Sequence, residues 1–360
     1  MDFKYFRTTI ATLIILSLAS TVVYFSLTGN VTRKVVPIKQ QQLHFLSYDD
    51  KINDNVCAHA LSLFHFSHGK HALRIYGLED SEKYSKDAHD KKSGKLVALN
   101  LLTRENTTFL QDNDIVVFLD GRDSFCMRDI DGLEEDFANT GKDLFIAAEK
   151  NCWPFLYAHF SKTFLNLFNP KTQHAPWNWS FKENQICTAL QIQAFLRNEE
   201  GPYPFPNSGG FIGRWRKMKE FLQLSWEIYK KMLKSDQQDD QAAAALAFLL
   251  SNDNSIVLDT KAHFIQCWDY RGAFDNYCTP NTTLVNKETG SFPYFHQHNA
   301  DKSFLEPCMQ YIGNISKESA SECFWISGDT GRKIYLKDVC QEQRKCCRFL
   351  GFDGTSASKQ

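Results

Sequence analysis

The chain has 360 residues, of which 43% are hydrophobic and 14% aromatic, so it is long and apolar enough to bury a large core. Its formal net charge is −1, which excludes the strongly basic balance of a nucleic-acid-binding domain. These values indicate one large globular domain, with or without a smaller appendage.

The first feature along the chain is an uncharged segment at residues 8–27, which is about as long as a helix that crosses a bilayer. A cleaved signal peptide is the alternative, because Leu18, Ala19 and Ser20 offer small residues near its middle. The segment continues apolar beyond that point, which favours an uncleaved signal anchor. Basic residues on both sides leave its orientation undecided.

Cysteines and glycosylation sequons favour a lumenal location for the rest of the chain. Eleven cysteines are many for a cytosolic protein, and their odd number leaves at least one thiol free or paired between chains. N-glycosylation sequons occur at Asn30, Asn106, Asn178, Asn281 and Asn314. We therefore predict a single-pass type II membrane protein of the Golgi or endoplasmic reticulum, with N-glycans on its lumenal part.

The chain divides by composition into five predicted segments. They are a cytoplasmic tail (1–7), the transmembrane anchor (8–27), a polar stem (28–50), a globular domain (51–305) and a Cys-rich tail (306–360). The last segment has the cysteine density of a small disulfide-stapled appendage.

Predicted strands and helices alternate within the globular domain, which favours an α/β fold. Strands are expected at 71–77, 115–119, 144–148, 256–259 and 263–266. A loop or lid is expected at 78–95, and helices at 94–102, 214–234 and 239–250. Residues 207–213 are expected to form a Gly-rich turn that runs into a strand.

Two carboxylates follow the apolar run at 115–119: Asp120 comes directly after it, and Asp123 comes three residues later. Such a run predicts a buried strand of a mostly parallel sheet, and ligands bind beyond the carboxyl ends of these strands. Two carboxylates there are costly unless a positive group lies between them, most simply a divalent cation. A turn with a solvated carboxylate pair is the alternative.

The other polar motifs are modest when taken singly. The segment from Asn207 to Gly210 is compatible with a simple tight turn. Asp239 and Asp240 are compatible with the acidic first turn of a helix, and His296 with a surface histidine.

The order of these motifs resembles the glycosyltransferase domain of the procollagen lysyl hydroxylase and hydroxylysine glycosyltransferase family. The resemblance covers about residues 68–305, and its blocks lie at 118–125, 147–154, 206–213, 239–241, 258–266 and 296–302. It implies a GT-A fold, which is a Rossmann-like mixed sheet flanked by helices, and a site for a UDP-sugar and Mn²⁺.

The same resemblance implies roles for individual residues. Its metal ligands would be Asp120, Asp123 and His296, with His298 as the alternative third ligand. Its catalytic carboxylates, which face the donor sugar and the acceptor, would be Asp239 and Asp240. Residues in contact with the UDP-sugar would be Gly77, Lys95, Asp120, Asn207, Ser208, Gly209, Gly210, Gln241 and Lys302.

These residue types suit the chemistry of sugar transfer. A carboxylate-held Mn²⁺ and a lysine can neutralise the diphosphate leaving group as its negative charge grows. A carboxylate on the sugar side can orient the acceptor hydroxyl, take its proton or stabilise oxocarbenium character.

The sequence also departs from the family. The block after His296 lacks the expected glycines, the nucleotide loop offers Tyr84 where a tryptophan is expected, and residues 155–205 are longer than their counterpart. No hydroxylase domain follows, so no lysyl hydroxylase activity is expected.

We therefore predict a metal-dependent hexosyltransferase that uses a UDP-sugar. Its donor is open between galactose and glucose, and its acceptor between a glycan and a protein hydroxyl, including hydroxylysine of collagen-like chains. The alternatives are a catalytically inactive membrane ectodomain that binds glycan or protein, and a disulfide-rich adhesion ectodomain.

Overall fold

The computed structural model describes residues 41–85, 94–104, 109–155, 183–197, 200–232, 239–268, 285–286, 288–298 and 305–343. The predicted anchor at 8–27 and Lys302, which is predicted to contact the UDP-sugar, lie outside these residues. Among the described helices, none combines the length and the apolarity that a membrane crossing needs.

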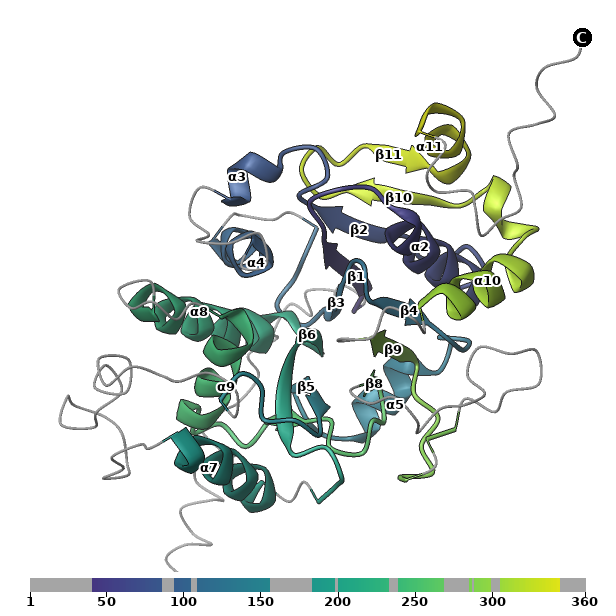
Figure 1. Ribbon diagram of the computed structural model, residues 1–360. Helices are drawn as coiled ribbons and strands as arrows, with labels where there is room; N and C mark the ends of the chain where they lie inside the picture. Colours follow the sequence, from purple (N-terminus) through teal and green to yellow (C-terminus); the bar gives the residue numbers. More distant parts are fainter. Residues whose placement is uncertain are drawn as a thin grey trace, which may run out of the picture. The chain divides into compact units, whose positions relative to one another are not determined.

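The described residues form an α/β fold around one mixed sheet of eleven strands (Figure 1). The strands are β1 (Leu43–Tyr48), β2 (Leu73–Tyr76), β3 (Ile115–Asp120), β4 (Ser124–Cys126), β5 (Leu144–Glu149), β6 (Phe205–Arg214), β7 (Ile256–Leu258), β8 (Ile265–Trp268), β9 (Phe295–His298), β10 (Phe324–Ser327) and β11 (Lys333–Tyr335). Their order in the sheet is β11-β10-β2-β1-β3-β6-β5-β8-β9-β4, and β7 pairs with β5.

The central strand β6 runs antiparallel to both of its neighbours. It pairs with β3 through Leu119 and Gly210, and with β5 through Glu149 and Phe205. The carboxyl ends of β3 and β5 therefore lie at the same edge of the sheet as the beginning of β6. Strands β1 and β2 run parallel to β3 and end at this edge as well.

Helices lie on both faces of the sheet (Figure 1). They are α2 (Asp54–Phe66), α3 (Ser81–Ser85), α4 (Gly94–Arg104), α5 (Leu133–Asn139), α7 (Glu183–Leu196), α8 (Trp215–Met232), α9 (Asp240–Leu250), α10 (Leu305–Ile315) and α11 (Leu336–Gln343), with a 3₁₀ turn at Ser319–Ser321. Side-chain oxygens cap two helix starts: Asn53 accepts from the backbone of α2, and Asp239 accepts from the backbone of α9.

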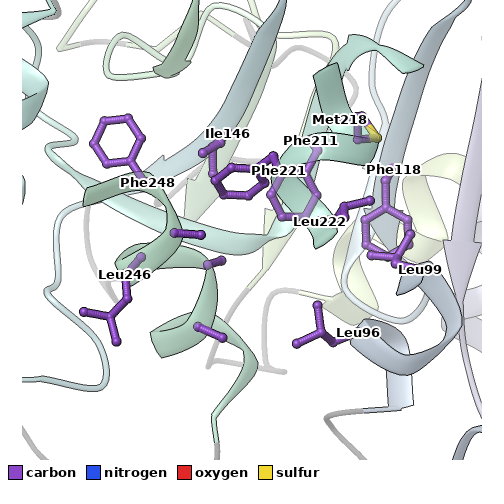
Figure 2. Packing of buried hydrophobic residues seen from close by; sticks show 14 of the residues in the cluster. Leu96, Leu99, Phe118, Ile146, Phe211, Met218, Phe221, Leu222, Leu246 and Phe248 are labelled. Carbon is purple, nitrogen blue, oxygen red and sulfur yellow. The ribbon is translucent and has the colours of Figure 1, made fainter. Parts of the chain in front are cut away.

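The apolar run of β3 serves two hydrophobic cores because successive side chains of a strand point to opposite faces. Val116 and Phe118 join the core beneath α4, α8 and α9, which Figure 2 shows. Ile115, Val117 and Leu119 join the core beneath α2, α5 and α10. This two-sided burial explains why the run has no polar alternation before Asp120.

The structure corrects the prediction for residues 207–213, which continue a strand and form no turn. Their glycines reflect close packing between strands. A Cβ on Gly210 would come within 3.0 Å of Ala147 Cβ, and one on Gly213 within 2.6 Å of the Asp143 carbonyl oxygen. Glycine therefore removes a side chain where neighbouring atoms leave no room.

The sheet also extends beyond both predicted ends of the globular domain. Strand β1 lies within the segment predicted as a stem (28–50), so the sheet begins before Lys51. At the other end, β10 pairs with β2, and α10 contributes Cys308 and Ile312 to the core beneath α2. The described part of the Cys-rich tail is therefore built into the fold. Three described cysteines, Cys126, Cys267 and Cys323, are buried thiols.

Candidate functional site

Four side chains from four elements converge at the carboxyl edge of the sheet around Lys95, the second residue of α4. Its ammonium nitrogen lies 3.2 Å from both carboxylate oxygens of Asp120 and 3.2 Å from the Ser208 hydroxyl oxygen. The same nitrogen lies 2.8 Å from Asp240 Oδ2, which also accepts a 2.7 Å hydrogen bond from Ser208. We call these four residues the Lys95 cluster.

The Lys95 cluster is largely shielded from water, since the exposed side-chain fractions are 13% for Lys95, 24% for Asp120 and 11% for Asp240. Burial lowers the pKa of Lys95, but the charges of Asp120 and Asp240 outweigh it, so this pKa lies above its ordinary value. Burial and the charge of Asp240 raise the pKa of Asp120, while Lys95 opposes that shift. Two carboxylates share one ammonium group, which leaves an excess of negative charge.

The two acids at the start of α9 have different positions. Asp239 is the N-cap residue, and its carboxylate accepts a 2.8 Å hydrogen bond from the backbone N–H of Ala242. Asp240, one residue later, turns its carboxylate to Lys95 and Ser208. Asp239 therefore acts as a helix cap, as expected for the acidic first turn of a helix. Asp240 instead lies with the other polar side chains at the sheet edge, where a site residue is expected.

The turn between Asp120 and Asp123 is anchored to the end of β1 and the two residues that follow it. Arg122 contacts the carboxylates of Asp49 and Asp50, with 2.9 Å from its Nε to each oxygen of Asp49. The backbone N–H of Gly121 donates to the carbonyl of Tyr48, the last residue of β1. The backbone of Gly121 also bonds the buried His59, whose pKa burial lowers to about 4.

The predicted metal ligands are only partly brought together. Asp120 and Asp123 flank one turn, and the side chain of His296 is buried on β9, where its backbone pairs with Phe125 of β4. Within the described residues, the three potential ligands whose atoms lie within 4.8 Å of one another are the exposed His68, Asp129 and Asp131, and not the predicted set. The negative excess at Asp120 fits a cation, but His296 does not complete a compact three-ligand site.

A second polar network adjoins the Lys95 cluster and centres on Glu149, the last residue of β5, which is 3% exposed. Its carboxylate accepts hydrogen bonds from Asn207 Nδ2 at 2.8 Å and from Gln241 Nε2 at 2.5 Å. Asn207 Oδ1 in turn accepts from the backbone of Gly209 at 2.8 Å and from Gln297 at 3.0 Å. This network fixes the amide groups of Asn207 and Gln241 beside Asp240.

Glu149 and Gln297 are absent from the residues predicted for the site. The sequence pattern could have identified Glu149, because this residue ends an apolar strand as Asp120 does. No local pattern could have identified Gln297, since its place beside Asn207 depends on the pairing of β9 with β8.

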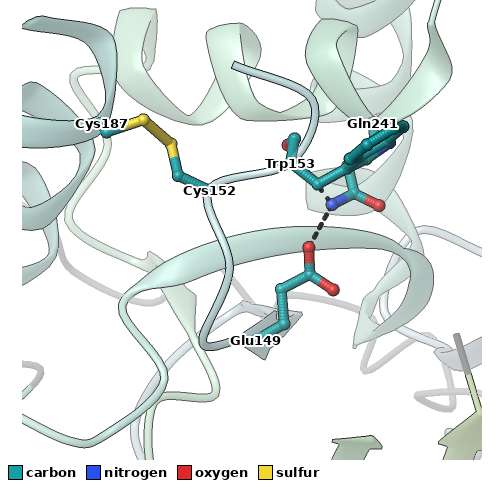
Figure 3. Close-up of a disulfide and its surroundings, with 5 residues drawn as sticks. All are labelled: Glu149, Cys152, Trp153, Cys187 and Gln241. Carbon is teal, nitrogen blue, oxygen red and sulfur yellow. Dashed lines mark hydrogen bonds between the residues drawn. A yellow bond between two sulfur atoms is a disulfide. The ribbon is translucent and has the colours of Figure 1, made fainter. Parts of the chain in front are cut away.

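A disulfide holds the loop that follows β5 (Figure 3). Cys152 is bonded to Cys187 of α7, and the carbonyl oxygen of the intervening Trp153 lies 3.5 Å from Gln241 Nε2. The Trp153 side chain is 45% exposed. The loop therefore lies against the start of α9, next to Glu149.

The glycines predicted for the site have three different surroundings. A Cβ on Gly209 would come within 2.8 Å of Asp120 Oδ2 and would overlap Gln297, so Gly209 lies at the Lys95 cluster. Gly210 lies inside the sheet against Ile265. Gly77 has a left-handed φ of +89° and lies against Tyr48 and Asp49 at the end of β1. The side chain of His298 lies outside the described structure.

Comparison with known proteins adds little to this geometry. No family model and no curated protein matches the sequence. Similar solved structures include the apo form of mouse xyloside xylosyltransferase 1, with a TM-score of 0.37 and 14% identity over 72% of this chain and 98% of that chain. Another is the apo structure of the bifunctional glycosyltransferase WbbM, with a TM-score of 0.39 and 13% identity over 77% of this chain and 50% of that chain. Both are named as glycosyltransferases, but at these scores the functional conclusion rests on the site.

Proposed function

We propose that this protein is a glycosyltransferase that moves a hexose from a UDP-sugar to a hydroxyl group. The observation that carries the proposal is the convergence of Lys95, Asp120, Ser208 and Asp240 at the carboxyl edge of the sheet. Ligands of open α/β sheets bind at this edge. The ordered motifs of the sequence, from Asp120 to the start of α9, supply three of these residues, namely Asp120, Ser208 and Asp240.

Lys95 would stabilise the leaving diphosphate. Its raised pKa keeps the ammonium group charged at neutral pH, and α4 fixes its position before the ligand arrives. A preorganised cation in a shielded site stabilises developing negative charge more strongly than a cation in water does.

Asp240 would act on the transferred sugar, next to Lys95. Its carboxylate is held by Ser208 and Lys95, so it is positioned to orient an acceptor hydroxyl, to accept its proton or to stabilise positive charge on the sugar ring. Asn207 and Gln241, fixed by Glu149, would offer amide groups to the sugar hydroxyls.

Mn²⁺ is part of the proposal because the site has more negative than positive charge. When bound by Asp120 and Asp123, the ion would supply Lewis-acid neutralisation of the diphosphate. Its third protein ligand would be His298, or His296 if its side chain moves toward the two carboxylates when the ion binds. The donor is open between UDP-galactose and UDP-glucose, and the proposed acceptors are hydroxylysine of collagen-like chains and other protein or glycan hydroxyls.

The proposal extends to where the reaction takes place. We propose that residues 8–27 anchor the chain as a type II protein and that the catalytic domain is lumenal in the Golgi or endoplasmic reticulum. Detection of N-glycans on the sequons would support this placement, and one of these sequons, Asn314, lies on the described α10.

The test is UDP release by the purified full-length protein with UDP-glucose or UDP-galactose, collagen peptides that contain hydroxylysine, and Mn²⁺. Asp240→Asn should abolish the release, whereas Asp338→Asn, on the exposed surface of α11, should not. If the wild type shows no turnover and no UDP-dependent rise in thermal midpoint, the proposal is contradicted. That result would favour the catalytically inactive ectodomain.

A further inference from the structure

The hairpin of β10 and β11 joins the tail to the edge of the sheet next to the site. Ser327 of β10 pairs with Ile75 of β2, and the backbone N–H of the following Gly328 donates to the carbonyl of Ile75. A Cβ on Gly328 would come within 2.5 Å of the ring of Tyr76, so the turn of the hairpin lies directly against the end of β2.

Asp329, at the tip of this hairpin, binds the segment that follows β2. Its carboxylate accepts from the backbone N–H of Gly77 at 3.1 Å and of Glu79 at 3.3 Å. It also accepts a 2.5 Å hydrogen bond from the hydroxyl of Tyr84, a buried residue of α3. One carboxylate thus ties both ends of residues 77–84 to the tail.

Glu79, which belongs to the segment after β2, in turn binds the hairpin. Its carboxylate accepts from the hydroxyl of Thr330 and from the guanidinium of Arg332, each at 2.6 Å, and from the hydroxyl of Ser327. These bonds lower the pKa of Glu79, with the one from Ser327 contributing most. The segment and the hairpin are therefore joined by two carboxylates, one from each side.

The segment contacts Tyr48 through both Gly77 and Tyr84, and its helix α3 also packs on α4. Tyr84 meets the ring of Tyr48 edge to face, with the ring centroids 5.8 Å apart. The hydroxyl of Tyr48 reaches the first residue of α4, because a Cβ on Gly94 would come within 2.1 Å of this oxygen. Lys95 is the next residue, so two successive contacts through Tyr48 connect Tyr84 to the start of α4.

We propose that Asp329 is a positioning residue for the site: it holds residues 77–84 against Tyr48 and thereby fixes the first turn of α4 and the ammonium group of Lys95. The effect on sugar transfer rests on the proposed function, whereas the coupling from Asp329 to α4 rests on the contacts alone.

Hydrogen–deuterium exchange in the full-length protein tests the coupling without any ligand. Asp329→Ala should speed amide exchange about tenfold in residues 77–85 and in the start of α4, because a charge-assisted hydrogen bond is lost. Asp338→Ala removes an exposed carboxylate from the same tail and should leave both regions unchanged. Tyr84→Phe keeps the ring on Tyr48 and should give a smaller increase.

Steady-state kinetics test the consequence for the site. Asp329→Ala should raise the KM for the UDP-sugar about tenfold, which corresponds to about 1.4 kcal/mol of binding, and leave the acceptor KM unchanged. A merely structural defect would lower the apparent kcat and change neither KM. Asp329→Asn, which keeps an acceptor for Tyr84, should restore part of the donor affinity and replaces Asp329→Ala if that variant does not fold.

The two ideas fail in different ways. Equal exchange at the start of α4 in Asp329→Ala and Asp338→Ala would overturn the role of Asp329, whatever the activity. A wild-type protein that neither binds nor consumes UDP-sugars would overturn the proposed function, and the exchange measurement would still decide whether Asp329 positions α4.

Discussion

The ammonium nitrogen of Lys95 lies 2.8 Å from a carboxylate oxygen of Asp240 in a site shielded from solvent. The two residues come from α4 and α9, and the packing of both helices on α8 sets their separation. With Asp120 as the second carboxylate, the site is net negative while it holds only its own side chains. A diphosphate can approach it favourably only if further positive charge is added, which is the physical reason to expect a divalent ion there.

Lys95→Met should reduce turnover about a hundredfold or more, because it removes a preorganised cation from the leaving-group side. It should also lower the free energy of unfolding by about 3 kcal/mol, since Asp120 and Asp240 lose their shared partner. Activity per folded molecule and the thermal midpoint measure the two effects separately. Lys333→Met, at an exposed position, is the matched control. A fall in activity that only mirrors the loss of folded protein would refute the role of Lys95.

Asp123→Ala should abolish Mn²⁺-dependent UDP release and leave the fold intact, because Asp123 is half-buried in a turn held by Arg122. Chelation of Mn²⁺ from the wild type should have the same effect and should be reversed when the ion is restored. Mn²⁺ binding, measured by calorimetry, adds a readout without turnover. Asp131→Ala, in the exposed group with His68 and Asp129, is the control. Full activity in Asp123→Ala, or loss of Mn²⁺ binding only in Asp131→Ala, would disprove the assignment.

Glu149→Gln should weaken the site through Asn207 and Gln241. The new amide can accept from only one of their two side-chain donors, so one buried donor loses its partner at a cost of about 1–3 kcal/mol. The KM for the UDP-sugar should rise together with a lower thermal midpoint. Glu227→Gln, on the surface of α8 beside Lys230, should change neither quantity. Unaltered KM and thermal midpoint in Glu149→Gln would contradict the network.

Local sequence signals predicted much of the central sheet and the helices around the site. The apolar run before Asp120 and the alanine-rich segment after Asp239 have strong local patterns, and they form β3 and α9. The prediction of a turn at residues 207–213 was wrong because glycine is common both in turns and in strands that pack closely against their neighbours. The second case depends on neighbours such as Ala147, which are far away in the sequence.

Asp120 could be singled out from the sequence because it ends an apolar strand, whereas contacts made by strand pairing could not be. Asp120 and Ser208 both reach Lys95 because β3 and β6 are neighbours. The role of the tail was missed because its cysteines indicate a separate appendage, while the pairing of β10 with β2 has no local signature. In the sequence Asp329 looks like an ordinary turn residue. Only in the folded sheet does its carboxylate accept hydrogen bonds from residues 77–84.

Asp239→Asn should change how stability depends on pH while keeping the helix cap, since asparagine caps helices as well as aspartate does. Burial, and then the charge of Asp240, raise the pKa of Asp239 from 3.8 to about 6 in the folded protein. The folded state therefore binds more protons than the unfolded state between these values. Its stability falls as the pH rises from about 4 to about 6, by on the order of 3 kcal/mol from this group.

The variant cannot ionise, so its thermal midpoint relative to that of the wild type should rise over the same interval and then level off. Scanning calorimetry from pH 4 to pH 8 measures this difference. If the curves of wild type and Asp239→Asn run parallel from pH 4 to pH 6, the folded protein does not hold Asp239 with a raised pKa, and the prediction is wrong.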